Sequence, residues 1–163
     1  MEEPARRIAA IIIEAAREHG YLDEPLATIP EVAEEEKKLF LRMFEAVRRR
    51  REEHGDELSC DEVSSMFTFV LAKAAEIVTG YICNRNDEPS LDGLFDGKIP
   101  VYSDDRVMAF CRQCSWAAEA GTAFWNADRG EGDPLLMLFE ALKWTFRIAE
   151  HIVIIHIEES NRK

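Results

Sequence analysis

The clearest chemistry-bearing motif in the sequence is a lone Cys-Arg-Gln-Cys, formed by Cys111 and Cys114. A structural zinc site needs two further ligands, and no second cysteine pair or histidine pair follows at a usable spacing. On the helix predicted here both thiols lie on the apolar face, where cysteine behaves as a small buried hydrophobe. With His156, on the apolar side of the last predicted helix, they mark the place where a helical bundle could enclose an apolar ligand.

The histidines give no sign of a metal centre. His151 and His156 are five residues apart, which places them about 140° apart around a helix and prevents joint coordination of one ion. The Glu-x-x-His pairs of di-iron bundles, the His-Glu-x-x-His motif and the glycine-rich phosphate loops do not occur in the sequence. We therefore expect no metal ion and no cofactor.

Carboxylates gather at the starts of two predicted helices. Glu34 and Glu35 lie near the start of the second helix, and Asp61 and Glu62 open the third. Acidic clusters on adjacent helices can hold magnesium and orient a nucleoside triphosphate. In composition the region resembles the all-α pyrophosphohydrolases of the MazG type, although it lacks their paired motif of a Glu-rich helix followed by Glu-x-x-Asp. The resemblance implies a magnesium-dependent pyrophosphohydrolase as one alternative function.

A basic run gives a second enzymatic alternative. Arg48 or Arg49 is followed five or six residues later by His54, a spacing similar to that in the active sites of HEPN-type helical ribonucleases. The polar residue that usually follows the arginine is missing, and a run of four arginines makes this spacing easy to meet. The resemblance implies a ribonuclease with Arg49 and His54 at its site. The same residue pattern also predicts ion pairs one helical turn apart, Arg48 with Glu52 and Arg49 with Glu53.

Five predicted helices position these residues. The 3.6-residue apolar period places them at about 3–19, 28–53, 59–81, 103–126 and 133–159. Capping boxes at Thr28–Glu31 and Ser59–Glu62 predict the starts of the second and third helices. No stretch alternates for long enough to predict a strand. We expect an all-α fold in a single domain, 1–163, a bundle of four or five helices with a long acidic loop, 84–102, between the third and fourth.

The third predicted helix is the candidate for the centre of the bundle. The stretch from Val63 to Ile82 is the most apolar in the chain and is long enough to cross a bilayer, but it contains Lys73 and Glu76. We therefore interpret it as a core helix of a soluble protein. One of its sides carries mostly small residues, such as Ser65, and a neighbouring backbone can approach closely there.

The fifth predicted helix points to a protein partner. Its polar residues cover only about 100° of its circumference, so a second apolar side remains beyond the one that a bundle core needs. That second side consists of Met137, Trp144, Ile148 and Ile155. Trp116, opposite the core face of the fourth helix, is a further interface candidate. Twofold pairing is the commonest way to bury such a surface, so we expect a homodimer.

Composition narrows the classes of function. The chain has 163 residues, of which 47% are apolar and 32% charged, and its net charge is −12. This charge repels nucleic acids and anionic lipids, so we expect neither nucleic acid nor membrane as a partner. No secretory signal is recognised, and four cysteines then indicate free thiols in a reducing, cytoplasmic setting. The leading hypothesis is a non-enzymatic cytoplasmic protein that acts through self-association or by binding another protein.

Overall fold

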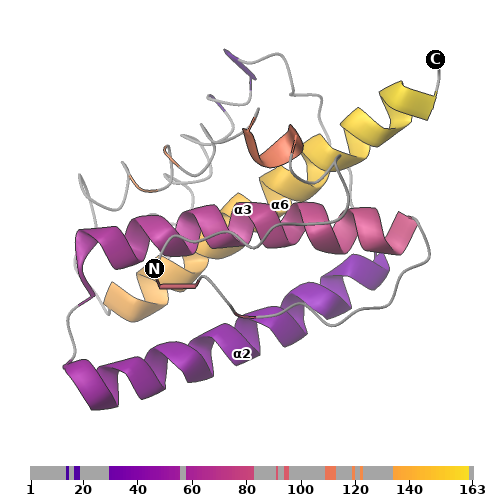
Figure 1. Ribbon diagram of the computed structural model, residues 1–163. Coiled ribbons are helices and arrows are strands. Elements are labelled where there is room, and N and C mark those ends of the chain that lie inside the picture. The colour runs from indigo at the N-terminus through magenta and orange to yellow at the C-terminus, as the bar shows by residue number, and fades with distance from the viewer. Residues whose placement is uncertain are drawn as a thin grey trace.

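The computed structural model describes residues 14, 17–18, 30–55, 58–82, 91, 94–95, 109–112, 119, 122 and 134–161. Nearly all of these residues are helical and none of them is in a strand, which confirms the all-α prediction for this part of the chain. Three long helices carry it: α2 (Pro30–His54), α3 (Cys60–Ile82) and α6 (Pro134–Asn161) (Figure 1). Their bounds lie within two residues of those predicted. The predicted helices 3–19 and 103–126 and the predicted loop 84–102 fall mostly outside the described residues.

The helices α3 and α6 run in the same direction, and α2 runs antiparallel to both. α2 is joined to α3 by residues 55–59, which reverse the chain. Between α2 and α6, the ring of Phe40 contacts Phe146 and that of Phe44 contacts Phe139, so later residues of α2 lie beside earlier residues of α6. α3 packs most extensively against α6, and Figure 1 shows α6 crossing behind it.

Aromatic and ionic contacts join α2 to α6. Phe40 makes edge-to-face contacts with Phe139 and Phe146, with ring centroids 6.2 and 6.0 Å apart. Each such pair contributes about 0.5–1.5 kcal/mol beyond the burial of its area. One turn earlier on α2, Glu36 Oε1 lies 3.8 Å from Arg147 Nε. Burial raises the pKa of Glu36, against the opposing effect of Arg147. This edge of the protein therefore combines a packed aromatic cluster with a half-buried carboxylate.

α3 is covered on nearly its whole circumference. Among its described side chains only Asp61 is exposed. By length and composition Asp61–Gly80 could cross a membrane, and 78% of that window is buried inside the protein. A core helix of a soluble protein passes the same test, and the burial fits the interpretation made from Lys73 and Glu76. The apolar character of α3 is thus used for packing within the chain.

The small residues of α3 admit another backbone, as their pattern predicted. Ser65 is buried, and its hydroxyl donates a hydrogen bond of 3.0 Å to the carbonyl oxygen of Leu94. Leu94 is itself 3% exposed, and Leu91 and Phe95 pack partly buried against the same core. These three residues belong to the predicted acidic loop. This part of it is therefore anchored on α3 by apolar side chains and one buried hydrogen bond.

Local signals in the sequence set the reversal between α2 and α3. Gly55 follows the last residue of α2 with φ of 97°, and its N–H donates to the carbonyl oxygen of Arg51 at 2.9 Å. This is the left-handed cap that glycine forms at helix C-termini. At the start of α3, Ser59 Oγ accepts from the Glu62 N–H at 3.1 Å, and Glu62 Oε1 accepts from the Ser59 N–H at 2.9 Å. The predicted capping box is confirmed.

Gly55→Ala tests the cap. A Cβ at this position meets nothing within 4 Å, so the cost comes from the positive φ alone. We expect the free energy of unfolding to fall by about 1 kcal/mol, as measured by urea denaturation. Gly55→Asn, whose side chain tolerates this conformation better, should lose less. Equal stability of Gly55→Ala and the wild type would contradict the assigned cap.

Candidate functional site

The α6 residues predicted to meet a partner differ in how far the chain itself covers them. Ile148 is 0% exposed, so the structure corrects its assignment as an interface residue: it belongs to the core. Trp144 packs partly buried against the core, and the Arg147 guanidinium lies 5.3 Å from its ring centroid. Ile155 is partly buried. Trp116 and the side chain of Met137 lie outside the described residues.

The polar side of α6 is also more enclosed than its sequence indicated. Glu150 and His151 belong to the polar residues of this helix, yet they are only 3% and 2% exposed. Both make interactions within the chain. Ile148, Glu150 and His151 are therefore enclosed by the chain itself. A partner on the remaining residues of this side of α6 stays a prediction.

The pocket candidates are described only at Cys111. The side chain of Cys111 is partly buried, and burial together with the Glu76 carboxylate raises the pKa of its thiol to about 11. At neutral pH it is protonated and a poor nucleophile. Cys114 and the side chain of His156 lie outside the described residues, so an enclosed apolar ligand stays a prediction.

The raised pKa gives a direct test of the surroundings of Cys111. We expect alkylation of Cys111 by iodoacetamide to be slow at pH 8 and to rise about tenfold per pH unit until the pKa near 11, because only the thiolate reacts. Peptide mass spectrometry measures this site separately from the other cysteines. In urea the same residue should react at the rate of an ordinary thiol. A folded-state rate that levels off below pH 9 would contradict the buried position beside Glu76.

A buried lysine on α3 was not recognised as a feature of the core from sequence. Lys73 is 1% exposed, and its Nζ donates a hydrogen bond of 2.9 Å to Glu76 Oε2. The same ammonium lies 5.3 Å from the ring centroid of Phe69. A buried charge is tolerated when it is paired in this way. The signal was present in the sequence as a lysine and a glutamate three residues apart on an otherwise apolar helix.

The carboxylates of the magnesium hypothesis are not brought together. α2 and α3 are antiparallel, so Glu34 and Glu35 lie at the opposite end of the pair from Asp61 and Glu62. Glu62 contacts Arg50 on α2. Arg50 follows Glu35 by fifteen residues, which correspond to about 22 Å along the helix, so Glu35 and Glu62 lie far apart. Within the described residues, no group of three or more His, Cys, Asp or Glu side chains could hold a metal ion.

Arg49 and His54, the residues of the ribonuclease hypothesis, are both exposed and lie beside acidic neighbours. Arg49 Nε lies 3.8 Å from Glu45 Oε1, and His54 Nε2 lies 3.7 Å from Glu53 Oε2. Arg48 also reaches back to Glu45, at 2.6 Å. Where forward pairs of Arg48 with Glu52 and Arg49 with Glu53 were predicted, both arginines contact Glu45, one turn earlier; the charge of Glu52 still acts on Arg48.

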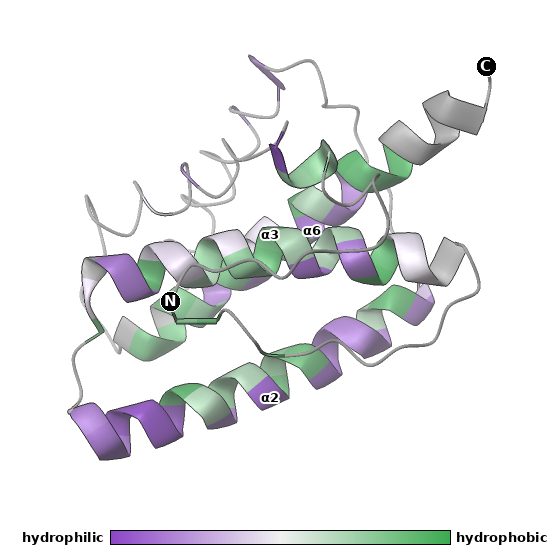
Figure 2. Cartoon of the chain, viewed as in Figure 1, coloured by the Kyte–Doolittle hydropathy of each residue, from purple (hydrophilic) through white to green (hydrophobic). Residues whose placement is uncertain are grey.

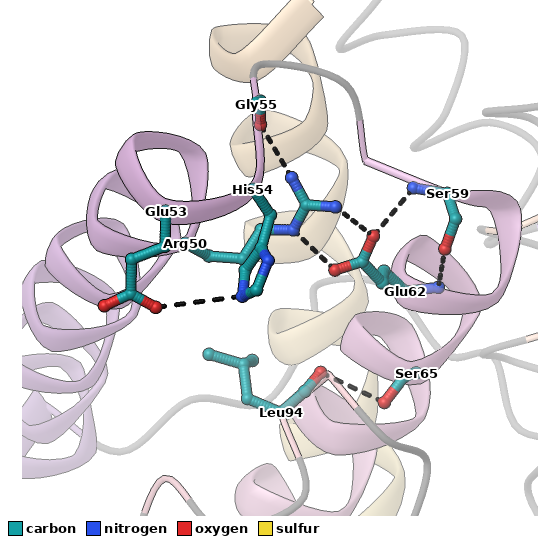
Figure 3. A network of polar contacts seen from close by, with 8 residues as sticks. All are labelled: Arg50, Glu53, His54, Gly55, Ser59, Glu62, Ser65 and Leu94. Carbon is teal, nitrogen blue, oxygen red and sulfur yellow. Dashed lines mark hydrogen bonds and ion pairs between the residues drawn. The ribbon is translucent and has the colours of Figure 1, made fainter.

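The arginine that organises this end of the protein is Arg50. Its Nε and Nη2 donate to the two carboxylate oxygens of Glu62, both at 2.6 Å, and its Nη1 donates to the carbonyl oxygen of Gly55 at 2.7 Å (Figure 3). Glu62 thus closes the capping box of α3 and clamps α2 with the same carboxylate. Burial would raise the pKa of Glu62, but hydrogen bonds from Arg50 and Ser59 outweigh it and the pKa is lowered. The role of this network is structural.

The lowered pKa of Glu62 predicts how stability depends on pH. A carboxylate with a lowered folded-state pKa stabilises the fold above its unfolded-state pKa, and this contribution is lost as the pH falls through the folded-state value. Glu62→Gln should therefore cost about 1–2 kcal/mol of unfolding free energy at pH 7. Its difference from the wild type should vanish in acid, where the wild-type carboxyl is protonated. Glu52→Gln, at an exposed position of α2, is the control and should change stability little; a deficit for Glu62→Gln that persists unchanged at pH 3 would contradict the ion pair.

An exposed apolar patch lies where α2 meets the start of α6. Leu41 is 69% exposed, Leu136 45% and Phe44 38%, and these are the exposed large hydrophobic residues of the described chain. Phe44 packs its ring 5.4 Å from that of Phe139, which follows Leu136 by one turn of α6. Leu41 precedes Phe44 by one turn of α2. We call Leu41, Phe44 and Leu136 the Leu41 patch; in Figure 2 green turns interrupt the purple of α2 near its middle.

Sequence reasoning passed over the Leu41 patch. Leu41 lies on the outward side of α2, away from the buried positions Leu39, Phe40 and Met43. A leucine among charged residues on a solvated side was the available signal. Scattered exposed leucines are ordinary on protein surfaces. These three exposed side chains differ because they lie on turns of α2 and α6 that the contact between Phe44 and Phe139 brings together.

Comparison with known proteins does not place the chain in a family: no protein family, curated protein or solved structure matches it. The function must therefore be argued from the geometry of the described surfaces.

Proposed function

We propose that this chain is a non-enzymatic cytoplasmic protein that acts by binding protein at the Leu41 patch. The observation that carries the proposal is the exposure of Leu41, Phe44 and Leu136 on adjoining turns of α2 and α6. Apolar surfaces of this kind, rimmed by charged residues, mark sites of protein interaction. The rim is present here, because Lys37, Lys38 and Arg48 are all exposed on α2.

The enzymatic alternatives have weaker support. The carboxylates named for a pyrophosphohydrolase lie at opposite ends of the α2–α3 pair, and Glu62 is committed to Arg50. Arg49 and His54, named for a ribonuclease, stand exposed beside acidic residues. The net charge of −12 also disfavours an RNA substrate. Protein binding is the function for which the described residues offer a surface.

Site-specific photocrosslinking tests the proposal without assuming the partner. With p-benzoylphenylalanine at position 41, the full-length chain expressed in cells should form discrete protein adducts on irradiation. The matched control is position 53, where Glu53 is exposed on another side of α2, and adducts should be absent there. Leu136→Asp should reduce the adducts at position 41 severalfold, because it places a charge in the same patch. Absence of protein adducts at position 41 would contradict the proposed function.

A further inference from the structure

We propose that the Leu41 patch binds a second copy of this chain, through antiparallel pairing of the two α2 helices with Leu41 at the twofold axis. This inference rests on the proposed function and names its partner. It follows from the order of charges along the outward side of α2, which is complementary to its own reverse.

The outward side of α2 is a narrow stripe centred on Leu41. At 100° per residue, Glu34 and Arg48 project within about 20° of Leu41, on opposite sides of it along the helix. Lys37 and Glu45 project within about 40°. Lys38 and Phe44 project within about 60°. All of these side chains are exposed except that of Glu45, which is partly exposed.

An antiparallel twofold pair brings together residues that are equally far from Leu41 in opposite directions. Glu34 stands seven residues before Leu41 and Arg48 seven residues after it, so each glutamate faces the other copy's arginine. Lys37 and Glu45 stand four residues before and after, and they also carry opposite charges. The twofold axis repeats each pairing, which gives four interchain ion pairs around two touching leucines.

The remaining stripe positions fit the same register. Lys38 and Phe44 stand three residues before and after Leu41, so the lysine stem can lie over the exposed ring of the other copy. Phe44 is 38% exposed even after packing on Phe139, so it retains surface for this contact. Parallel pairing would place each charged residue beside the same residue of the other chain, Glu34 beside Glu34 and Arg48 beside Arg48, so like charges would meet. The charge order therefore selects antiparallel pairing.

Net charge favours α2 as the contact between two acidic chains. The whole chain has a net charge of −12, so two copies repel each other over most of their surfaces. α2 itself contains seven acidic and seven basic residues and is neutral. Its exposed pairs within one chain, Arg48 with Glu45 and Lys38 with Glu35, are weakly held and can rearrange at little cost. Two crossing helices form a small interface, so we expect a dissociation constant in the micromolar range.

Charge reversal at positions 34 and 48 tests the pairing. Glu34→Arg alone sets an introduced arginine against Arg48 twice in a homodimer, and Arg48→Glu alone sets an introduced glutamate against Glu34 twice. Each variant should weaken self-association at least tenfold, measured by sedimentation equilibrium of the full chain. An equimolar mixture of the two should form a heterodimer. Across it, the arginine introduced at position 34 faces the glutamate introduced at position 48, and the unchanged Arg48 of the first variant faces the unchanged Glu34 of the second, so both facing pairs join unlike charges. The double variant Glu34→Arg/Arg48→Glu should form a homodimer again.

Two controls keep the result specific. Glu14→Arg and Arg17→Glu reverse charges in an exposed pair outside α2, and neither their single effects nor their mixture should change association. Circular dichroism should show that every variant keeps the wild-type helix content.

The outcomes separate this inference from the function on which it rests. Rescue on mixing supports the antiparallel α2 pair. A wild-type chain that stays monomeric at hundreds of micromolar, or single variants that dimerise as the wild type does, would overturn it. Failure of the double variant to associate would also overturn it. In each of these cases protein adducts at position 41 still decide the proposed function independently.

Discussion

The structure depends on the need to cover α3 on all sides. This helix exposes only Asp61 among its described side chains, and it contributes ten residues to the described apolar core, as many as α6. Burial of apolar side chains contributes about 25 cal/mol per Å², so covering α3 supplies a large part of the stability of this helix arrangement. α6 and α2 both pack against α3. On the side of α3 that carries small residues, Ser65 donates a hydrogen bond to the carbonyl oxygen of Leu94.

The same constraint decides where charged and reactive groups can reside. Lys73 is held in the core by Glu76 and the ring of Phe69, and Cys111 is kept protonated by burial near that carboxylate. Arg50 and Glu62 close the α2–α3 hairpin with paired charges. In each place a polar group is matched to a partner within the chain, so its chemistry is used for structure. Among the described residues, the exposed large apolar side chains are those of the Leu41 patch, where we propose binding.

Sequence predicted the local features well, because their causes are local. The capping box of Ser59 and Glu62 and the bounds of three helices each depend on a few adjacent residues. The central position of α3 also followed from its composition. The site could not be predicted in the same way. A helical projection shows which residues share a side of α6, but it does not show how far the neighbouring segments extend around the helix. Ile148 was therefore assigned to an interface although it is buried. Leu41 was overlooked because its exposure depends on which side of α2 the rest of the chain leaves uncovered, and the sequence of α2 does not show this.

We propose that the chain meets its partner at the Leu41 patch and not on the side of α6 that carries Ile148. Methyl NMR of the purified chain at increasing protein concentration tests it most directly, because one titration observes both helices. We expect concentration-dependent shifts of the Leu41 and Leu136 methyl signals, while the methyl signals of buried Ile148 stay fixed. Shifts at Ile148 with unchanged signals at Leu41 would contradict the proposal and return the interface to the Ile148 side of α6.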